Sequence, residues 1–294
     1  SQLLGAPASR AGSMAVIFVG SATPGEGKSG VAAAIARTLA YAGTPVRLVR
    51  LAEDGANAAA DASWFGSLDF VPGTESVAAA AIPVAEADET LVVEGPLAAF
   101  PGGDAKLVVV AAEKAPKNAD AAAIVVTGVD GLIGARATEG SPLVIEIGED
   151  RTLAGFSVAE AREALNAEVL VEGDLDRTSD HLVIAPIGSD AGQPYLRRFD
   201  SKAVVVRFDK NDQHLAALKA DPNVLILTGG RRPSEYLFDA AGANGVPVLL
   251  SRTDTENTVI ALEGIFDHTR FQGERKLDRM AELLEGTGLF EALA

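Results

Sequence analysis

SATPGEGKS, residues 21–29, is the stretch that decides the fold. It follows the apolar run Ala15–Val19 and precedes the alanine-rich, helix-favouring stretch Gly30–Tyr41. A strand, a glycine-bearing loop and a helix in this order form a phosphate-binding loop, because the first amides of the helix and its positive dipole end face the anion. We expect the loop to bind a nucleotide through Thr23, Gly25, Glu26, Gly27, Lys28, Ser29 and Gly30.

The loop meets the spacing GxxxxGK[ST] with Ala22 in the first glycine position. In this motif the lysine, Lys28, reaches the terminal phosphates, and the hydroxyl of Ser29 is offered to Mg²⁺. The alternative is a glycine-rich turn whose lysine is merely solvated. That alternative leaves the GKS triplet unexplained.

Length and composition bound the class of protein. The chain has 294 residues, which suits two domains that each bury a core. It has 48% hydrophobic residues, and no apolar run reaches the length of about 18 residues that a membrane span needs. We therefore expect no membrane segment.

Charge and residue usage exclude several kinds of site. The chain has no cysteine, which excludes disulfides, thiolate zinc sites and cysteine nucleophiles. His181, His214 and His268 lie too far apart in sequence for a histidine metal motif. The formal charge of −16 disfavours nucleic acid or an anionic membrane as partner.

We expect no secretory signal in residues 1–13, because no charged segment leads into a long apolar one. We expect residues 1–13 to be a leader or a tag remnant, and the protein to be cytoplasmic.

The first half of the chain alternates short apolar runs with helical or loop stretches, which is the pattern of βαβ units. We expect parallel strands at 15–19, 46–51, 90–93, 106–110, 123–127 and 143–147. The predicted fold is therefore α/β, a doubly wound parallel sheet whose ligand lies at the carboxyl ends of the strands.

The pattern restarts in the second half. Residues 157–170 open with a capping-box spacing and are predicted to be a helix. We expect strands at 182–185, 203–208, 224–227 and 246–250, helices at 212–220 and 234–243, and an amphipathic helix at 274–293. The expected domains are residues 14–170, a smaller α/β domain at 171–270, and a C-terminal helix within 271–294.

Three further residues are candidates for the nucleotide site. Glu94 ends the run Leu91–Val93 and precedes Gly95, so it can supply the carboxylate that Mg²⁺ needs beside the phosphates; the alternative is a glutamate that merely caps a strand. Asp54 is a second candidate metal ligand, with Glu53 an equal claimant. Thr127 is a candidate contact to the base, although a threonine there also caps strands.

The order of a PGEGKS loop, a strand ending VVEG, a strand ending VTG and the stretch SPLVIEIGEDRTLAGFSVAEAREALNAEVL resembles the dethiobiotin-synthetase-like domain of long bacterial phosphotransacetylases. The following region resembles their DRTGG domain, on the segments RFDKND (207–212), LTGG (227–230), VPVLLS (246–251) and DTENT (254–258). The resemblance covers residue 14 to about residue 267.

The resemblance implies a SIMIBI-type P-loop fold in which Lys28 and Ser29 bind phosphate and Mg²⁺ and Glu94 is the strand-end acid. We expect ATP and Mg²⁺ as ligands, with Lys28 and Glu94 as catalytic candidates and Ser29, Glu94 and Asp54 as metal candidates. Three features depart from dethiobiotin synthetases. Arg50-Leu51 stands where they carry Lys-Pro, and Glu94-Gly95-Pro96-Leu97-Ala98 stands where they carry EGxGG. Thr127 or Gly128 stands where they carry the asparagine that reads adenine. The acetyltransferase domain is absent from these 294 residues.

Three functions fit these observations. The first is a Mg-ATP-binding protein with a DRTGG regulatory domain that regulates or scaffolds a metabolic, acetyl-phosphate or CoA-type process, within a homo-oligomer or with a metabolic enzyme partner. The second is an ATP-dependent ligase or kinase for a small carboxylate or amine, with the acceptor against Glu94 and the loop Pro101–Gly103. The third is a structural protein with a vestigial loop.

Overall fold

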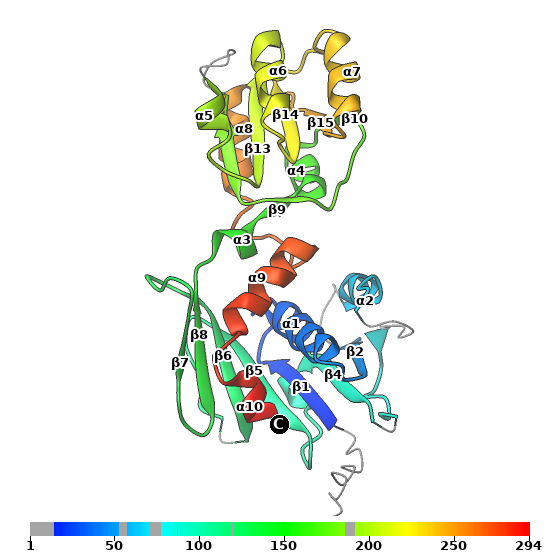
Figure 1. Ribbon diagram of the computed structural model, residues 1–294, viewed down its shortest axis with the longest axis vertical. Coiled ribbons are helices and arrows are strands. Elements are labelled where there is room, and N and C mark those ends of the chain that lie inside the picture. The colour runs from blue at the N-terminus through cyan, green and yellow to red at the C-terminus, as the bar shows by residue number, and fades with distance from the viewer. Residues whose placement is uncertain (1–14, 53–57, 71–77, 87, 119, 186–191) are drawn as a thin grey trace, which may run out of the picture. The chain divides into compact units, whose positions relative to one another are not determined.

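The computed structural model describes residues 15–52, 58–70, 78–86, 88–118, 120–185 and 192–294 (Figure 1). The chain forms two compact units. The first joins residues 1–150 with 277–294, and the second is Arg151–Lys276. The boundary after Asp150 places the helix expected at 157–170 in the second unit, although we expected it in the first domain. Residues 277–294, at the end of the chain, belong to the first unit.

The first unit is built on an eight-stranded sheet in the order β3-β2-β4-β1-β5-β6-β8-β7. Its strands are β1 (Ala15–Ser21), β2 (Val46–Leu51), β3 (Ala78–Ala79), β4 (Thr90–Pro96), β5 (Lys106–Ala112), β6 (Ala121–Val129), β7 (Ala135–Thr138) and β8 (Leu143–Gly148). All neighbours pair in parallel except β7 and β8. The six expected strands are thus present and parallel, with a short β3 and an antiparallel edge strand β7 added.

The first unit contains the helices α1 (Lys28–Tyr41), α2 (Ala58–Gly66), the 3₁₀ turn η1 (Leu97–Ala99) and α10 (Leu289–Leu293), and most of α9 (Glu274–Leu284). Helix α1 packs on β1, β2 and β4, and α10 packs on β6 and β8. Arg37 of α1 forms an ion pair with Asp278 of α9 at 2.7 Å.

Alternation along the strands decides which side chains face α1. Phe18, Val49 and Val93 belong to the apolar cluster on one face of the sheet. Because successive side chains of a strand point to opposite faces, Arg50 and Glu94 lie on the other face. Two charged residues of buried strands are thereby brought to the side of the phosphate-binding loop.

The second unit is built on a five-stranded sheet in the order β10-β15-β14-β13-β12. These strands are β10 (Glu168–Val171), β12 (His181–Ile184), β13 (Lys202–Arg207), β14 (Val224–Thr228) and β15 (Val248–Leu250). Only β10 runs antiparallel to its neighbour. The strands β9 (Phe156–Ser157) and β11 (Thr178–Ser179) pair antiparallel in a separate two-stranded sheet.

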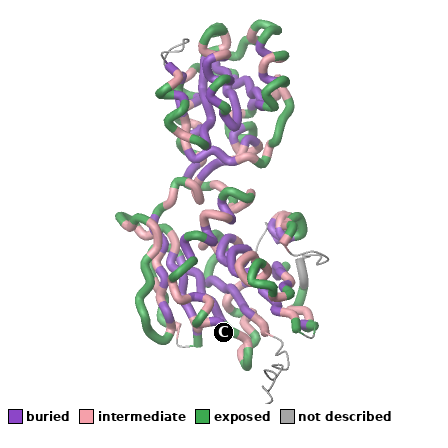
Figure 2. Tube along the Cα trace, in the orientation of Figure 1, coloured by how far each residue is buried: buried purple, intermediate pink, exposed green. Residues whose placement is uncertain are grey.

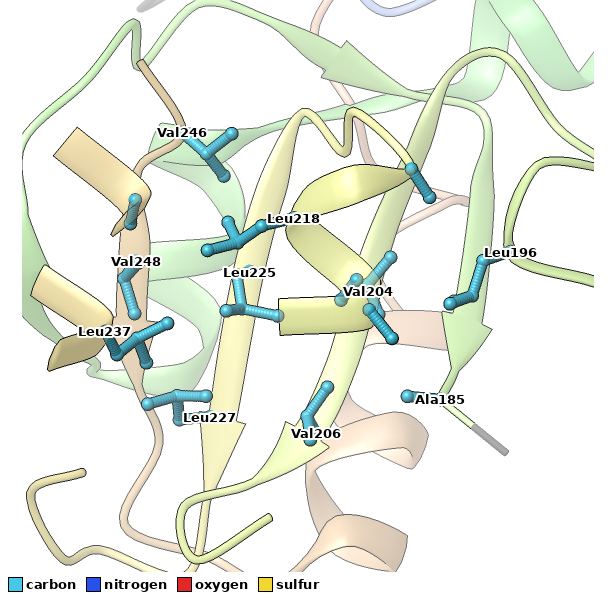
Figure 3. Packing of buried hydrophobic residues seen from close by; sticks show 14 of the residues in the cluster. Ala185, Leu196, Val204, Val206, Leu218, Leu225, Leu227, Leu237, Val246 and Val248 are labelled. Carbon is cyan, nitrogen blue, oxygen red and sulfur yellow. The ribbon is translucent and has the colours of Figure 1, made fainter. Parts of the chain in front are cut away.

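The second unit contains the helices α3 (Arg151–Ala154), α4 (Val158–Leu165), α5 (Gln193–Leu196), α6 (Asn211–Lys219), α7 (Tyr236–Ala243) and α8 (Thr255–Glu263). Helices pack on both faces of its sheet. Figure 3 shows the core under α5, α6 and α7, where Leu196, Leu218 and Leu237 pack on the strands. The opposite face packs on α4 and α8, for example through Val205 and Leu262. The buried strands stand out in the burial view (Figure 2).

Two expected helices are shorter in the structure. The helix expected at 157–170 ends at Leu165, because Asn166 adopts φ 44° as a left-handed C-cap and residues 168–171 form β10. Its capping box between Ser157 and Glu160 is confirmed by both hydrogen bonds. The helix expected at 274–293 is divided into α9 and α10, since Gly286 and Gly288 adopt positive φ between them.

Within the described ranges, none of the helices has the length and apolar character needed to span a bilayer.

Candidate functional site

The predicted phosphate-binding loop connects the end of β1 at Ser21 to the start of α1 at Lys28. Gly25 and Gly27 have φ values of 86° and 95°, a region that L side chains rarely adopt. Gly27 is the N-cap of α1 and brings no capping side chain, and the first turn holds no acidic residue. The helix therefore presents its positive end without an internal anion to neutralise it.

Lys28 lies against the loop. Its side chain is buried, and Nζ donates a hydrogen bond to Ser21 Oγ at 2.8 Å. The Ser21 hydroxyl in turn donates to the carbonyl of Thr23 at 2.5 Å. The backbone N–H of Thr23 donates to Glu26 Oε2 at 3.2 Å. A single network of short-range contacts thus holds the lysine at the loop.

Glu94 lies next to this loop, near the carboxyl end of β4 and in register with Val19 of β1. It is 1% exposed, and Ser29 Oγ donates a hydrogen bond to its Oε1 at 2.8 Å. Its Oε2 is buried and has no hydrogen-bond partner among the residues that the structure describes. Burial raises the pKa of the Glu94 carboxyl to about 7, although Arg50, the Ser29 hydroxyl and Lys28 oppose the rise.

Arg50 is a residue of the site for which sequence reasoning predicted no role. It pairs in register with Glu94 across β2 and β4, and its Nη1 lies 2.9 Å from Glu94 Oε1. Its Nη2 lies 3.2 Å from Oδ2 of Asp61 in α2. The available signal was an arginine inside the strand VRLVRL, because a charge in a buried strand requires a partner.

Thr127, at the end of β6, contacts the loop. Its hydroxyl donates to the carbonyl of Glu26 at 3.0 Å and lies 3.4 Å from the carbonyl of Ala111. A Cβ on Gly27 would lie 3.3 Å from Thr127 Cγ2, so the glycine permits this close approach. The described contacts of Thr127 are with the protein, and its contact to a base stays a prediction.

The other predicted residues are placed as follows. Gly30 is buried in the first turn of α1, whereas Thr23 and Gly25 are exposed. Asp54 lies outside the described residues, so its proposed metal contact is untested. The structure brings together Lys28, Ser29, Glu94 and Thr127 around one loop.

The oxygen donors at the loop suit Mg²⁺. The Ser29 hydroxyl and the unpartnered Oε2 of Glu94 are hard oxygen ligands, and Mg²⁺ on a nucleotide needs only one or two protein groups. Over the described ranges, no group of three or more His, Cys, Asp or Glu side chains is arranged to hold a metal. A Mg²⁺ ion at this site would therefore need phosphate oxygens as additional ligands. It would also compete with Arg50 for the carboxylate of Glu94.

A hollow of about 500 Å³ lies beside the same edge of the sheet. It is lined by Leu51, which follows Arg50, by Pro96, which ends β4, and by small residues such as Ala98 of η1. Its apolar walls suit the hydrocarbon part of a small molecule. The expected acceptor loop, Pro101–Gly103, follows η1, with Gly102 and Gly103 at φ 72° and 67°.

Part of this chain is similar to a solved structure. A solved structure that matches is the crystal structure of the CBS and DRTGG domains of the regulatory region of Clostridium perfringens pyrophosphatase, complexed with its activator diadenosine tetraphosphate. It is 19% identical, with a TM-score of 0.33, and the match covers 40% of this chain and 50% of that chain. Thus only half of that protein's chain has a counterpart here.

The DRTGG family model matches residues 160–265, which lie within the second unit. The match begins inside α4 and ends just after α8, so it includes the complete five-stranded sheet. The second unit of this chain therefore contains a DRTGG domain.

Proposed function

We propose that the first unit is a P-loop domain that binds a Mg²⁺-nucleotide complex, with ATP as the expected nucleotide, and that the DRTGG domain makes the protein a regulator of a metabolic process. The observation that carries the proposal is the loop at residues 21–29. It lies between β1 and an uncapped helix, with Lys28 and Ser29 next to the buried carboxylate of Glu94.

Each residue has a role in binding. The amides at the start of α1 and the Lys28 ammonium would neutralise the phosphates. The Ser29 hydroxyl and Glu94 would hold the cation, which supplies charge neutralisation at the phosphates when bound. Thr127 positions the loop through its bond to Glu26.

Regulation rather than turnover is favoured by Arg50. Its guanidinium contacts Glu94 and Asp61, so the strand-end carboxylate is already paired. A carboxylate engaged in this way is less available to hold the cation or to orient a nucleophile. A regulatory domain that binds a nucleotide without turning it over does not need a free Glu94 carboxylate. Such a domain would act within a homo-oligomer or on a metabolic enzyme partner.

The decisive experiment is a calorimetric titration of the full chain with ATP and Mg²⁺. Lys28→Ala should abolish binding, because the phosphates lose their closest ammonium. Lys106→Ala is the matched control, since this exposed lysine begins β5 at the opposite end of the strands. Equal affinities of wild type and Lys28→Ala, or no binding by the wild type, would overturn the proposal.

A second candidate is an ATP-dependent ligase or kinase, and the hollow beside Leu51, Pro96 and Ala98 favours it. A small carboxylate or amine seated there would lie at the same sheet edge as Glu94, and Lys28 would stabilise the charge of the transferred phosphoryl group. The test is ADP release in the presence of candidate acceptors. If an acceptor raises the rate of ADP release and Lys28→Ala abolishes this rise, the protein is an enzyme. If no acceptor changes the rate of ADP release, the regulatory function is favoured.

A further inference from the structure

The DRTGG domain holds a hollow of about 590 Å³ that the proposed nucleotide site does not use. We call it the arginine pocket. Three segments line it: Arg207 and Phe208 at the end of β13, Thr228, Gly229 and Arg231 around the end of β14, and Asp254, Thr255 and Glu256 at the start of α8. It therefore lies at the carboxyl ends of parallel strands, where α/β sheets bind ligands.

The walls of the arginine pocket are held by the protein itself. The hydroxyls of Thr228 and Thr255 are 2.8 Å apart, and the N–H of Gly229 donates to the carbonyl of Thr253 at 2.8 Å. Gly229 has φ 96°, and a Cβ there would lie 2.8 Å from the ring of Phe208. The close approach of ring and backbone therefore requires glycine, and the pocket is shaped before any ligand arrives.

Two guanidinium groups approach one aromatic ring in this pocket. Arg207 and Arg231 come from different connections, and each lies 5.9 Å from the ring centre of Phe208. Arg207 is also paired with Asp209, whose Oδ1 lies 2.9 Å from its Nε. Its remaining guanidinium donors and those of Arg231 are the groups that can hold an anion in the pocket. In a chain of net charge −16, a convergence of two arginines on one pocket favours a phosphate or carboxylate as ligand.

Two carboxylates, those of Asp254 and Glu256, also line the pocket. Asp254 caps α8 by accepting the N–H of Asn257 at 2.8 Å, and Glu256 is exposed in the first turn. An ionised carboxylate accepts hydrogen bonds but cannot donate them. Asp254 and Glu256 therefore suit the hydroxyl groups of a ligand, and they repel a ligand that is anionic throughout. The pocket therefore selects a molecule with an anionic end and a hydroxyl-bearing end.

We propose that the arginine pocket binds a sugar phosphate, either free or as part of a nucleotide. The phosphate lies between Arg207 and Arg231, and the sugar hydroxyls donate to Asp254 and Glu256. The site is separate from the phosphate-binding loop, and it gives the DRTGG domain a ligand of its own.

The test uses the full chain carrying Lys28→Ala, so that the proposed loop site is silenced. Calorimetric titrations with ribose 5-phosphate, ADP, inorganic phosphate and ribose separate the parts of the ligand. We expect ribose 5-phosphate to bind about tenfold or more tightly than inorganic phosphate, and ribose not to bind. Tighter binding of ADP than of ribose 5-phosphate identifies the nucleotide source, and the reverse identifies the free sugar phosphate.

Adjacent arginines provide a matched pair of variants. Arg231→Gln removes a charge from the pocket and should weaken binding about tenfold or more, because a charge-assisted hydrogen bond is lost. Arg232→Gln removes the same charge outside the pocket, where Arg232 lies 3.6 Å from Glu168 and stacks on Phe238, and should leave the affinity unchanged. Both arginines are exposed, so neither variant should unfold the domain.

A wild-type pocket that binds no sugar phosphate at millimolar concentration overturns the proposal. So does equal weakening by Arg231→Gln and Arg232→Gln, which indicates general charge attraction. Because Lys28→Ala is present throughout, these outcomes are independent of whether the phosphate-binding loop binds ATP.

Discussion

Arg50 and Glu94 face each other across two parallel strands, and the guanidinium nitrogen Nη1 lies 2.9 Å from the carboxylate oxygen Oε1. Both side chains are almost completely buried. The carboxylate also accepts the Ser29 hydroxyl through Oε1. The pair therefore connects the strand next to the edge of the sheet to the first turn of α1, and its charges bear on both stability and ligand binding.

The first prediction concerns the stability of this pair. Arg50→Met leaves the carboxylates of Glu94 and Asp61 buried without their cation and should lower the free energy of unfolding by about 3 kcal/mol. In Arg50→Met/Glu94→Gln the loss should be smaller than the sum of the two single losses, since the stranded charge is removed. Trp64, the chain's single tryptophan, lies in α2 and reports unfolding of the first unit by fluorescence in urea. Additive losses would contradict the coupling.

The second prediction concerns cation binding and rests on the proposed function. Without Arg50, Glu94 is free for Mg²⁺, so Arg50→Met should lower the Mg²⁺ dissociation constant of the nucleotide complex about tenfold. Calorimetric titration of Mg²⁺ into the ADP-saturated protein measures it. Asp61→Asn is the control, because it leaves the Arg50–Glu94 contact in place, and it should not tighten Mg²⁺ binding. A weaker affinity in Arg50→Met would mean that Arg50 helps the cation to bind.

The third prediction separates two roles of Thr127. Thr127→Val removes the hydrogen bond to the Glu26 carbonyl and should cost about 1 kcal/mol of stability. If the hydroxyl positions the loop, ATP and GTP should lose affinity by the same factor, and Thr127→Ser should restore most of it. A change in the ratio of the two affinities would indicate contact with the base. Parallel titrations with both nucleotides measure this ratio.

The fourth prediction concerns pH. Burial lowers the pKa of Lys276 to about 8 from 10.5, and its Nζ donates to the carbonyl of Arg270 at 2.7 Å. Between these values the unfolded chain binds more protons than the folded one, so the free energy of unfolding should rise with pH from about 8 to 10.5.

Lys276→Met isolates this contribution. Scanning calorimetry of the two proteins at pH 7, 9 and 10.5 should show a larger gain of unfolding temperature in the wild type than in the variant. Other groups titrate in both proteins alike, so the difference belongs to Lys276. Parallel curves would mean that the lysine keeps its ordinary pKa in the folded protein.

The parts of the fold that follow from local pattern were predictable. The strands around residues 15–19 and 90–93 are continuous apolar runs, as strands buried on both faces require. The capping box at Ser157 and Glu160 follows from two residue types at a fixed spacing. The end of that helix was not predictable by spacing, because residues 168–171 remain compatible with a helix until β15 offers them an antiparallel partner.

The candidate site also has one part that the sequence predicted and one part that it did not. The motif GKS at residues 27–29 predicts a phosphate-binding loop, because its chemistry lies in consecutive residues. The role of Arg50 depends on strand order: β2 lies next to β4, and the register places Arg50 opposite Glu94. Arg50 and Glu94 lie far apart in the sequence, and the local sequence pattern does not predict which strands are neighbours in the sheet.

The sequence alone determined the alternation of strands and helices and the glycine-bearing loop at residues 21–29, because hydrophobic period and turn chemistry are properties of neighbouring residues. The segments of the DRTGG domain were expected from a family resemblance and not from these patterns. Only the tertiary structure decided that Arg50 pairs with Glu94, that Thr127 supports the loop, and that Arg207 and Arg231 converge on Phe208. These contacts depend on strand order and register, which the packing of the whole sheet selects.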